Sequence, residues 1–232
     1  MKVVTFIPAR GGSKGLKKKN LKILAGIPLI AWPIKHALRS KYVDDVVVTT
    51  DDKEIAKVAK EFGANIPFLR PESISGDLAT TEDTLKHALE EYEKIYSKVD
   101  LCVFLTCTDI FRKPEWIDQA IEIMINDNEL ESVFSGHKTH KNFWQKNENG
   151  NWERLKDWMA TYSSRQVRRY IVREDTGLCC VSRSYIWREG RRIGNNVDVL
   201  ENNDFLTAVD IHTKEDLKIA ELLLNMRLAG DI

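Results

Sequence analysis

The chain has 232 residues, 43% of them hydrophobic and 30% charged, and its 35 basic and 35 acidic side chains cancel to a formal net charge of zero. This length favours a single domain over residues 1–232 that needs neither disulfides nor a structural metal, and the apolar content excludes a disordered chain. No apolar run reaches the roughly 18 residues of a membrane span, and Pro8 and Arg10 break the stretch that an export signal keeps apolar. We therefore expect a cytoplasmic protein without a membrane partner.

Short apolar runs alternate with amphipathic stretches through most of the chain. In chain order, the pattern predicts a strand at residues 2–7, a helix at 28–40, a strand at 45–50, a helix at 52–62, a strand at 66–69, a helix at 80–96, a strand at 101–105, a helix at 115–125, a strand at 132–135 and a last helix at 213–228. Pro67 favours an edge position for its strand, and Thr80 is suited to begin a helix. This alternation predicts an α/β fold, with a mostly parallel sheet covered by helices on both faces.

The alternation breaks between residues 137 and 195, a region rich in Trp, Arg, Asn and Gly with only short apolar stretches. We interpret approximately 137–195 as an insertion or subdomain within the single domain.

Cations gather in two segments. Residues 1–22 carry seven basic residues and no acid, and residues 154–192 carry ten basic and four acidic residues. A nucleic-acid-binding domain is usually basic as a whole, so we expect no nucleic-acid partner. Two local clusters suit a compact polyanion, such as a nucleoside triphosphate with its metal, although solvated surface charge explains many of these side chains.

The loop of residues 9–20 directly follows the first predicted strand, where a parallel sheet binds its ligand. Its three glycines allow a close backbone approach to an anion, and Arg10, Lys14 and Lys19 add full charges. The spacing fits neither the P-loop nor the dinucleotide-binding motif. A solvated turn is the alternative, but the position after the strand favours phosphate binding.

Residues 8–15 (PARGGSKG), followed by Lys19 and Asn20, resemble the signature loop of the CMP-sialic acid synthetases, the acylneuraminate cytidylyltransferases. Further matches follow in that family's order: 49–51 (TTD) with 55–56 (IA), 70–71 (RP) with Asp77 and 80–81 (TT), 105–112 (LTCTDIFR), 165–166 (RQ), 209–213 (VDIHT) and 216–217 (DL). The resemblance covers nearly the whole chain. It implies a three-layer α/β/α nucleotidyltransferase, Rossmann-like, whose small insertion mediates homodimerisation. The implied reaction transfers CMP from CTP to a sialic acid-like sugar acid and releases pyrophosphate, with Mg²⁺ or Mn²⁺.

The resemblance also implies roles for particular residues. The catalytic set is Arg10, Lys19 and Asp210. The nucleotide-binding set is Ala9, Arg10, Gly11, Gly12, Ser13, Lys14, Lys19, Asn20, Arg70, Asp77 and Thr80. The acceptor-binding set is Thr106, Arg165, Gln166 and His212. The metal ligand is Asp210. We add two second candidates that the resemblance does not supply: Asp109, because it follows the predicted strand that ends at Leu105, and His212, because it stands in the place of a family aspartate.

Departures from the family pattern lie around the sugar acid. His212 stands where the family has a second metal aspartate, Thr106 replaces a glutamine, and Asp109-Ile110 replaces Ser-Pro. Residues 209–212 look strand-like, which predicts that Asp210 and His212 face the same side. Two alternatives therefore stay open: a cytidylyltransferase acting on a phosphate or phosphonate acceptor, and a non-catalytic nucleotide-binding homologue.

Overall fold

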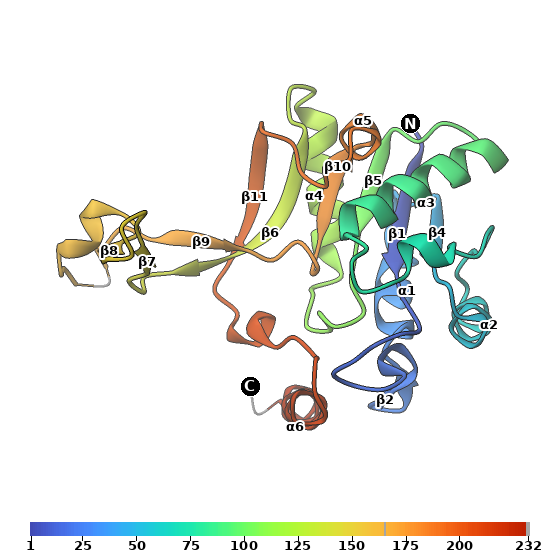
Figure 1. Cartoon of the computed structure of the whole chain (residues 1–232), viewed down its shortest axis with the longest axis horizontal. Helices are drawn as coiled ribbons and strands as arrows, with labels where there is room; N and C mark the ends of the chain where they lie inside the picture. Colours follow the sequence, from blue (N-terminus) through green and yellow to red (C-terminus); the bar gives the residue numbers. More distant parts are fainter. Residues whose placement is uncertain (165, 231–232) are drawn as a thin grey trace.

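A seven-stranded sheet forms the centre of the computed structural model, which describes residues 1–164 and 166–230 (Figure 1). In spatial order the strands are β11 (Val197–Asn202), β6 (Ser132–Thr139), β10 (Cys180–Arg183), β5 (Leu101–Phe104), β1 (Val3–Pro8) and β4 (Asp45–Thr49), with β9 (Ile171–Glu174) paired to the end of β6. β1 runs parallel to β4 and β5, and β11 runs parallel to β6, whereas β10 is antiparallel to both of its neighbours. The predicted mostly parallel sheet is thereby confirmed.

Helices cover both faces of this sheet. They are α1 (Ala31–Ala37), α2 (Lys53–Glu61), α3 (Thr81–Ile95), α4 (Glu115–Asn126), α5 (Ser184–Arg188) and α6 (Lys214–Ala229). α1, α2 and α4 pack on one face, where their apolar side chains join those of alternate strand residues such as Ile7 and Val103. α3 and α5 pack on the other face against Phe6 and Phe104. Period-2 alternation along buried strands thus builds two cores, and the three-layer architecture is confirmed.

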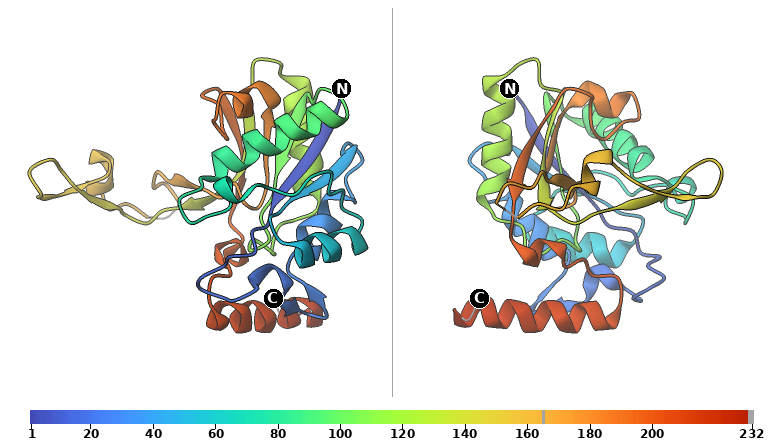
Figure 2. Two further views of the ribbon diagram at one scale, coloured as in Figure 1. Left: turned by 45° about the vertical axis from the view of Figure 1, so that its right-hand side comes forward. Right: turned by 90° about the vertical axis from the view of Figure 1, so that its left-hand side faces the viewer.

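A third apolar cluster lies where the strands end. α6 packs Ala220 and Leu224 against Leu16 of the first loop and Ile110, and it runs across the bottom of the molecule in both views of Figure 2. The side chain of Thr213 begins α6 by accepting from the backbone of Asp216, which bonds back to the cap residue. This capping box fixes the chain just after residue 212 beside the first loop.

Three local expectations were wrong. Residues 66–69 form no strand: only a single bridge between Val47 and Asn65 continues the sheet there. The first helix begins at Ala31, because Ile27–Pro28 (β3) pairs instead with Ile23–Leu24 (β2). Residues 209–212 are not a strand either.

The region between residues 137 and 195 divides into two parts. β10 and α5 belong to the central body. The antiparallel pair formed by the end of β6 and by β9 extends away from that body and carries β7 (Trp144–Lys146), β8 (Trp152–Arg154) and the 3-10 turn η3 (Asp157–Ala160) (Figure 2). We call residues 140–170 the arm. None of the helices in the described part of the chain is long and apolar enough to cross a membrane.

Candidate active site at the carboxyl end of the sheet

The loop after β1 borders a cavity of about 440 Å³, a size typical of small-molecule sites. Its lining comes from the end of β1 and the loop, from residues 70–84, from the end of β5 and the residues after it, and from the turn before α6: Pro8, Arg10, Ser13, Lys14, Gly15, Leu16, Lys19, Asn20, Arg70, Ile74, Ser75, Gly76, Asp77, Ala79, Thr80, Thr81, Thr84, Phe104, Thr106, Cys107, Thr108 and His212. These segments meet because parallel strands end at the same edge of the sheet. We call this cavity the loop pocket.

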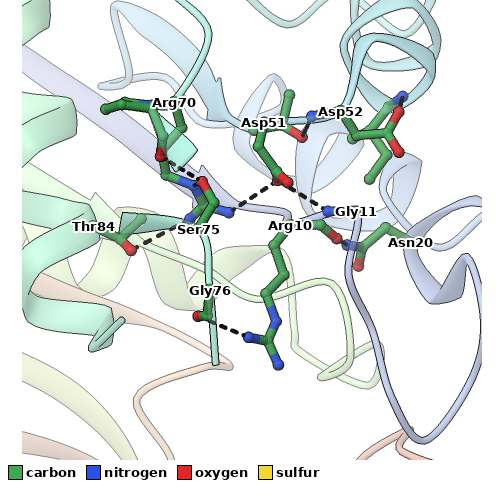
Figure 3. A network of polar contacts seen from close by, with 12 residues as sticks. Arg10, Gly11, Asn20, Asp51, Asp52, Arg70, Ser75, Gly76 and Thr84 are labelled. Carbon is green, nitrogen blue, oxygen red and sulfur yellow. Dashed lines mark hydrogen bonds and ion pairs between the residues drawn. The ribbon is translucent and has the colours of Figure 1, made fainter. Parts of the chain in front are cut away.

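Hydrogen bonds within the loop and to the segment after β4 set the shape of the loop (Figure 3). The Gly11 N–H donates to Asp51 Oδ1 at 3.0 Å, and Asn20 Nδ2 donates to the Arg10 carbonyl at 3.0 Å. A Cβ on Gly11 would lie 2.7 Å from Asp52 Oδ2 and 3.0 Å from Asp52 Cβ, so a larger residue there would displace the Asp52 side chain. Asp51 and Asn20 therefore hold the loop in place from behind.

Arg70 connects the residues that form the wall of the loop pocket opposite the loop. Its buried guanidinium donates to Ser75 Oγ at 3.1 Å and Thr84 Oγ1 at 3.3 Å, and lies 3.5 Å from Asp51 Oδ1. Burial lowers the pKa of Arg70, and the Asp51 charge opposes that shift. One carboxylate thus connects the loop to this wall.

Two loop cations share one carboxylate. Lys14 Nζ lies 2.6 Å from Asp77 Oδ2, and Arg10 Nη1 lies 3.3 Å from Asp77 Oδ1 and 3.1 Å from the Gly76 carbonyl. The hydrogen bond from Lys14 lowers the pKa of Asp77. Asp77 therefore gathers Arg10 and Lys14 at the mouth of the pocket.

Lys19 is more enclosed. Its Nζ donates to the Ile211 carbonyl at 3.2 Å. Burial lowers its pKa, and the nearby charges of Asp210 and Asp109 oppose this shift. A partly desolvated ammonium interacts strongly with an anion brought beside it, which suits Lys19 to a developing phosphate charge.

Asp210 and His212 meet although the expected strand is absent. His212 Nε2 and Asp210 Oδ2 are 2.7 Å apart, and both side chains are open to solvent. The Asp216 carboxylate accepts from the His212 N–H at 2.9 Å and holds this turn. The juxtaposition places a carboxylate and an imidazole next to Lys19.

Asp109 lies under the end of β5. Thr106 Oγ1 donates to its carboxylate, and Gly177 packs so closely against it that a Cβ there would overlap Asp109. The buried Arg112 fixes this turn by donating to the carbonyls of Leu178 at 2.6 Å and Thr106 at 2.8 Å. Burial raises the pKa of Asp109.

The structure brings most of the proposed site residues to one place and separates a few. Ten of them line the loop pocket: Arg10, Ser13, Lys14, Lys19, Asn20, Arg70, Asp77, Thr80, Thr106 and His212. Ala9 is buried and donates its N–H to Thr49, and Gly12 faces solvent. Gln166 lies on the arm, and Arg165 lies outside the described residues. Sequence reasoning gave Asp51 and Gly15 no role of their own, although Asp51 stands in the TTD motif.

Gly15 offers a test of how closely the loop must approach residue 212. A Cβ on Gly15 would lie 2.6 Å from the His212 carbonyl oxygen, whereas one on Gly12 meets nothing within 4 Å. We expect Gly15→Ala to lower the free energy of unfolding by about 1–3 kcal/mol through overpacking, and Gly12→Ala to change it little. Urea titration of both variants measures this. Equal stability of the two would show that the loop does not depend on the contact.

The fold and the pocket together indicate the class of protein. A glycine- and lysine-rich loop at the carboxyl end of a parallel sheet, facing a cavity edged with cations, marks a nucleotide-binding α/β protein.

Residues 4–229 match the cytidylyltransferase family, and the chain belongs to that family. It is 42% identical over 123 residues to the CMP-N,N'-diacetyllegionaminic acid synthase of Legionella pneumophila, covering 53% of each chain. It is 32% identical over 233 residues to the pseudaminic acid cytidylyltransferase of Campylobacter jejuni, covering 96% of each. The chain thus spans about half the length of the first relative and nearly all of the second. The family predicted from the motifs is confirmed.

A solved structure of CMP:2-keto-3-deoxy-manno-octonic acid synthetase complexed with CTP shares the fold, with a TM-score of 0.73, 18% identity and coverage of 98% of this chain and 100% of that chain.

Proposed function

We propose that the protein transfers CMP from CTP to a sialic acid-like nonulosonic sugar acid and releases pyrophosphate. The observation that carries this proposal is the convergence of Arg10, Lys14 and Lys19 on one pocket at the carboxyl end of β1. The names of the two relatives, which are CMP-transferring enzymes of sugar acids, support the substrate class.

In this reaction an acceptor oxygen attacks the α-phosphorus of CTP in line, and the bond to the leaving pyrophosphate breaks. Arg10 and Lys14, at the pocket mouth, would neutralise the triphosphate and hold the leaving group. Lys19 would stabilise the charge that develops on the α-phosphate, because its ammonium is partly desolvated and held by the Ile211 carbonyl. Asn20, Arg70 and Thr80 lie along the pocket, where they would contact the nucleoside.

The residues present fit a divalent cation. The Asp210 carboxylate is open to solvent beside Lys19, and His212 engages one of its oxygens. The described residues contain no cluster of three or more His, Cys, Asp or Glu side chains placed to hold a metal. Mg²⁺ is typically held by one or two carboxylates together with substrate phosphates and water, so Asp210 would hold it, with Asp109 or His212 as the second protein group. When bound, Mg²⁺ or Mn²⁺ neutralises phosphate charge.

The sugar acid would occupy the side of the pocket formed by Thr106 and His212, with Arg165 and Gln166 as further contacts. We further propose that the protein works in the cytoplasm. The four cysteines are free and buried, as a reducing compartment favours.

Nucleotide preference tests this proposal. We expect CTP with Mg²⁺ to raise Tm more than UTP or ATP does, because a ligand that binds the folded state stabilises it in proportion to its affinity. Thermal unfolding at equal nucleotide concentrations measures the shifts. Equal shifts for the three nucleotides would contradict the cytidine assignment of Asn20, Arg70 and Thr80.

We also propose that the arm joins two copies of the chain. It exposes Trp144, Trp152 and Tyr162, and Arg154 lies over the rings of Trp144 and Tyr162. Exposed aromatic side chains with arginine are enriched in protein interfaces. We expect Trp144→Ala with Trp152→Ala to shift a dimer toward monomer in light scattering, while Trp32→Phe, in the body, leaves the mass unchanged. A wild-type monomer at all concentrations would contradict the homodimer.

A further inference from the structure

The Asp77 carboxylate pairs with two of the cations that the proposed reaction uses. Lys14 Nζ lies 2.6 Å from Asp77 Oδ2, and Arg10 Nη1 lies 3.3 Å from Asp77 Oδ1. In the proposed function the same two cations neutralise the triphosphate and hold the leaving pyrophosphate. Carboxylate and phosphate oxygens accept the same charge-assisted hydrogen bonds from lysine and arginine. Asp77 and a polyphosphate are therefore alternative partners of one pair of cations.

The contacts of Asp77 are open to solvent. The exposed fraction of the side chain is 38% for Arg10, 77% for Lys14 and 48% for Asp77. Exposed ion pairs contribute little to the stability of a fold, so the two cations can exchange this carboxylate for another anion without disturbing a core. By contrast, the Arg70 side chain is 4% exposed, and its contact with Asp51 belongs to the wall of the pocket.

Asp77 stands on a short turn, residues 76–79, beside the mouth of the loop pocket. The Ala79 N–H donates to the Gly76 carbonyl at 3.3 Å, and the same carbonyl accepts from Arg10 Nη1 at 3.1 Å (Figure 3). Leu78, the next residue after Asp77, is 97% exposed, so a core does not anchor this part of the turn. The Asp77 carboxylate can therefore move away from the cations without displacing a packed element.

We propose that Asp77 is a positioning residue that competes with polyphosphate for Arg10 and Lys14. It holds the two cations at the pocket mouth, releases them to the arriving phosphates, and pairs with them again when pyrophosphate leaves. This inference rests on the proposed function, because it concerns the same site and the same polyphosphate. It gives Asp77 a role opposite to a direct nucleotide contact, since a carboxylate and a phosphate repel each other.

Lys19 separates this role from the chemical step. The contact that fixes Lys19 Nζ is the uncharged carbonyl of Ile211, at 3.2 Å, and the Asp77 carboxylate pairs with Arg10 and Lys14 instead. A change at residue 77 should therefore act mainly on how tightly polyphosphate binds.

Asp77→Asn removes the competing charge and keeps the shape of the side chain. The binding of CTP, inorganic pyrophosphate and inorganic tripolyphosphate to the full chain is measured by calorimetry, in Mg²⁺ and in EDTA. We expect Asp77→Asn to lower the Kd of all three about two- to tenfold, because one negative charge leaves the site and two cations lose their partner. Asp77→Ala, which has no group that can donate to a phosphate, should act in the same direction.

Two controls separate competition from a general change of charge. Glu72→Gln removes an exposed carboxylate in the nearby 3-10 turn η2 (Glu72–Ile74), outside the pocket lining, and should leave Kd nearly unchanged. In a Lys14→Ala background, one of the two contested cations is gone, so Asp77→Asn should tighten binding less than it does in the wild type. The Tm of each variant without added ligand shows that it is folded.

Unchanged or weaker polyphosphate binding by Asp77→Asn would overturn the inference, and weakening confined to the Mg²⁺ solutions would make Asp77 a metal ligand instead. Equal tightening with and without Lys14, or the same tightening in Glu72→Gln, would also overturn it. The proposed function fails separately: equal Kd values for CTP, UTP and ATP would contradict it and leave the competition at Asp77 standing. A wild-type chain that binds none of the polyphosphates would contradict both.

Discussion

Replacing Lys19 with alanine should lower the turnover of CTP about a hundred- to thousand-fold, the usual effect of removing one preorganised donor from a developing charge. The ammonium of Lys19 is partly desolvated and fixed by the Ile211 carbonyl. In the Lys19→Ala variant, a mobile lysine on the surface therefore cannot take over its role. Pyrophosphate release with CTP, Mg²⁺ and a panel of nonulosonic acids measures the rate. Arg10→Ala should also lower turnover strongly, because that guanidinium lies at the pocket mouth.

Lys17→Ala is the matched control, because Lys17 lies in the same loop but is exposed and does not line the pocket. It should keep nearly full turnover. Circular dichroism and Tm should be similar for all three variants, since none of these side chains belongs to the core. Near-normal rates in both Lys19→Ala and Arg10→Ala would remove the loop from the mechanism.

Asp210→Ala should abolish Mg²⁺-dependent turnover, because the metal bound to the triphosphate then loses the carboxylate open to it beside Lys19. His212→Asp should keep activity and lower the Mg²⁺ concentration needed for half-maximal rate, since a hard cation gains a carboxylate oxygen. A Mg²⁺ titration of both variants measures the two effects.

The control for charge alone is Asp198→Asn, which removes an exposed carboxylate on β11 whose single hydrogen bond within the described part of the chain comes from the neighbouring Val199 N–H. It should leave the Mg²⁺ dependence unchanged. Full Mg²⁺-dependent activity of Asp210→Ala would show that the metal lies elsewhere, and Asp109 would be the next residue to replace.

The sequence predicted those parts of the fold whose cause is local. Val46, Val47 and Val48 favour a strand by side-chain shape, and Asp52 and Thr80 cap helices with their own side chains. The pairing of segments that are far apart in the chain was harder to predict from the sequence. Residues 66–69 are as apolar as a strand, but Phe68 packs beside the α3 core instead of extending the sheet. β10 looked like part of the insertion, because its antiparallel place between β5 and β6 depends on strands about 50 and 75 residues earlier in the chain.

In the candidate site, too, local features could be predicted from the sequence and contacts between distant segments could not. The prediction that the loop after β1 binds phosphate rests on its glycines, cations and position, all of which are visible in the sequence. The partners of those cations could not be predicted, since Asp77 is more than sixty residues from Lys14 and the Ile211 carbonyl is 192 residues from Lys19. The contact of Asp210 with His212 was anticipated for a strand, and it arises instead from a turn held by Asp216.

The arm leaves and re-enters the body at neighbouring points, because Thr139 at the end of β6 pairs with Ile171 at the start of β9. A segment whose two ends already touch can be exchanged or shortened with little loss of chain-closure entropy in the rest of the fold. None of the arm residues that the structure describes lines the loop pocket. Apart from Arg165 and Gln166, for which we propose contacts with the sugar acid, residues 140–170 can therefore change in evolution while the nucleotide-binding end of β1 stays intact. A chimaera that carries a relative's arm would exploit the same independence.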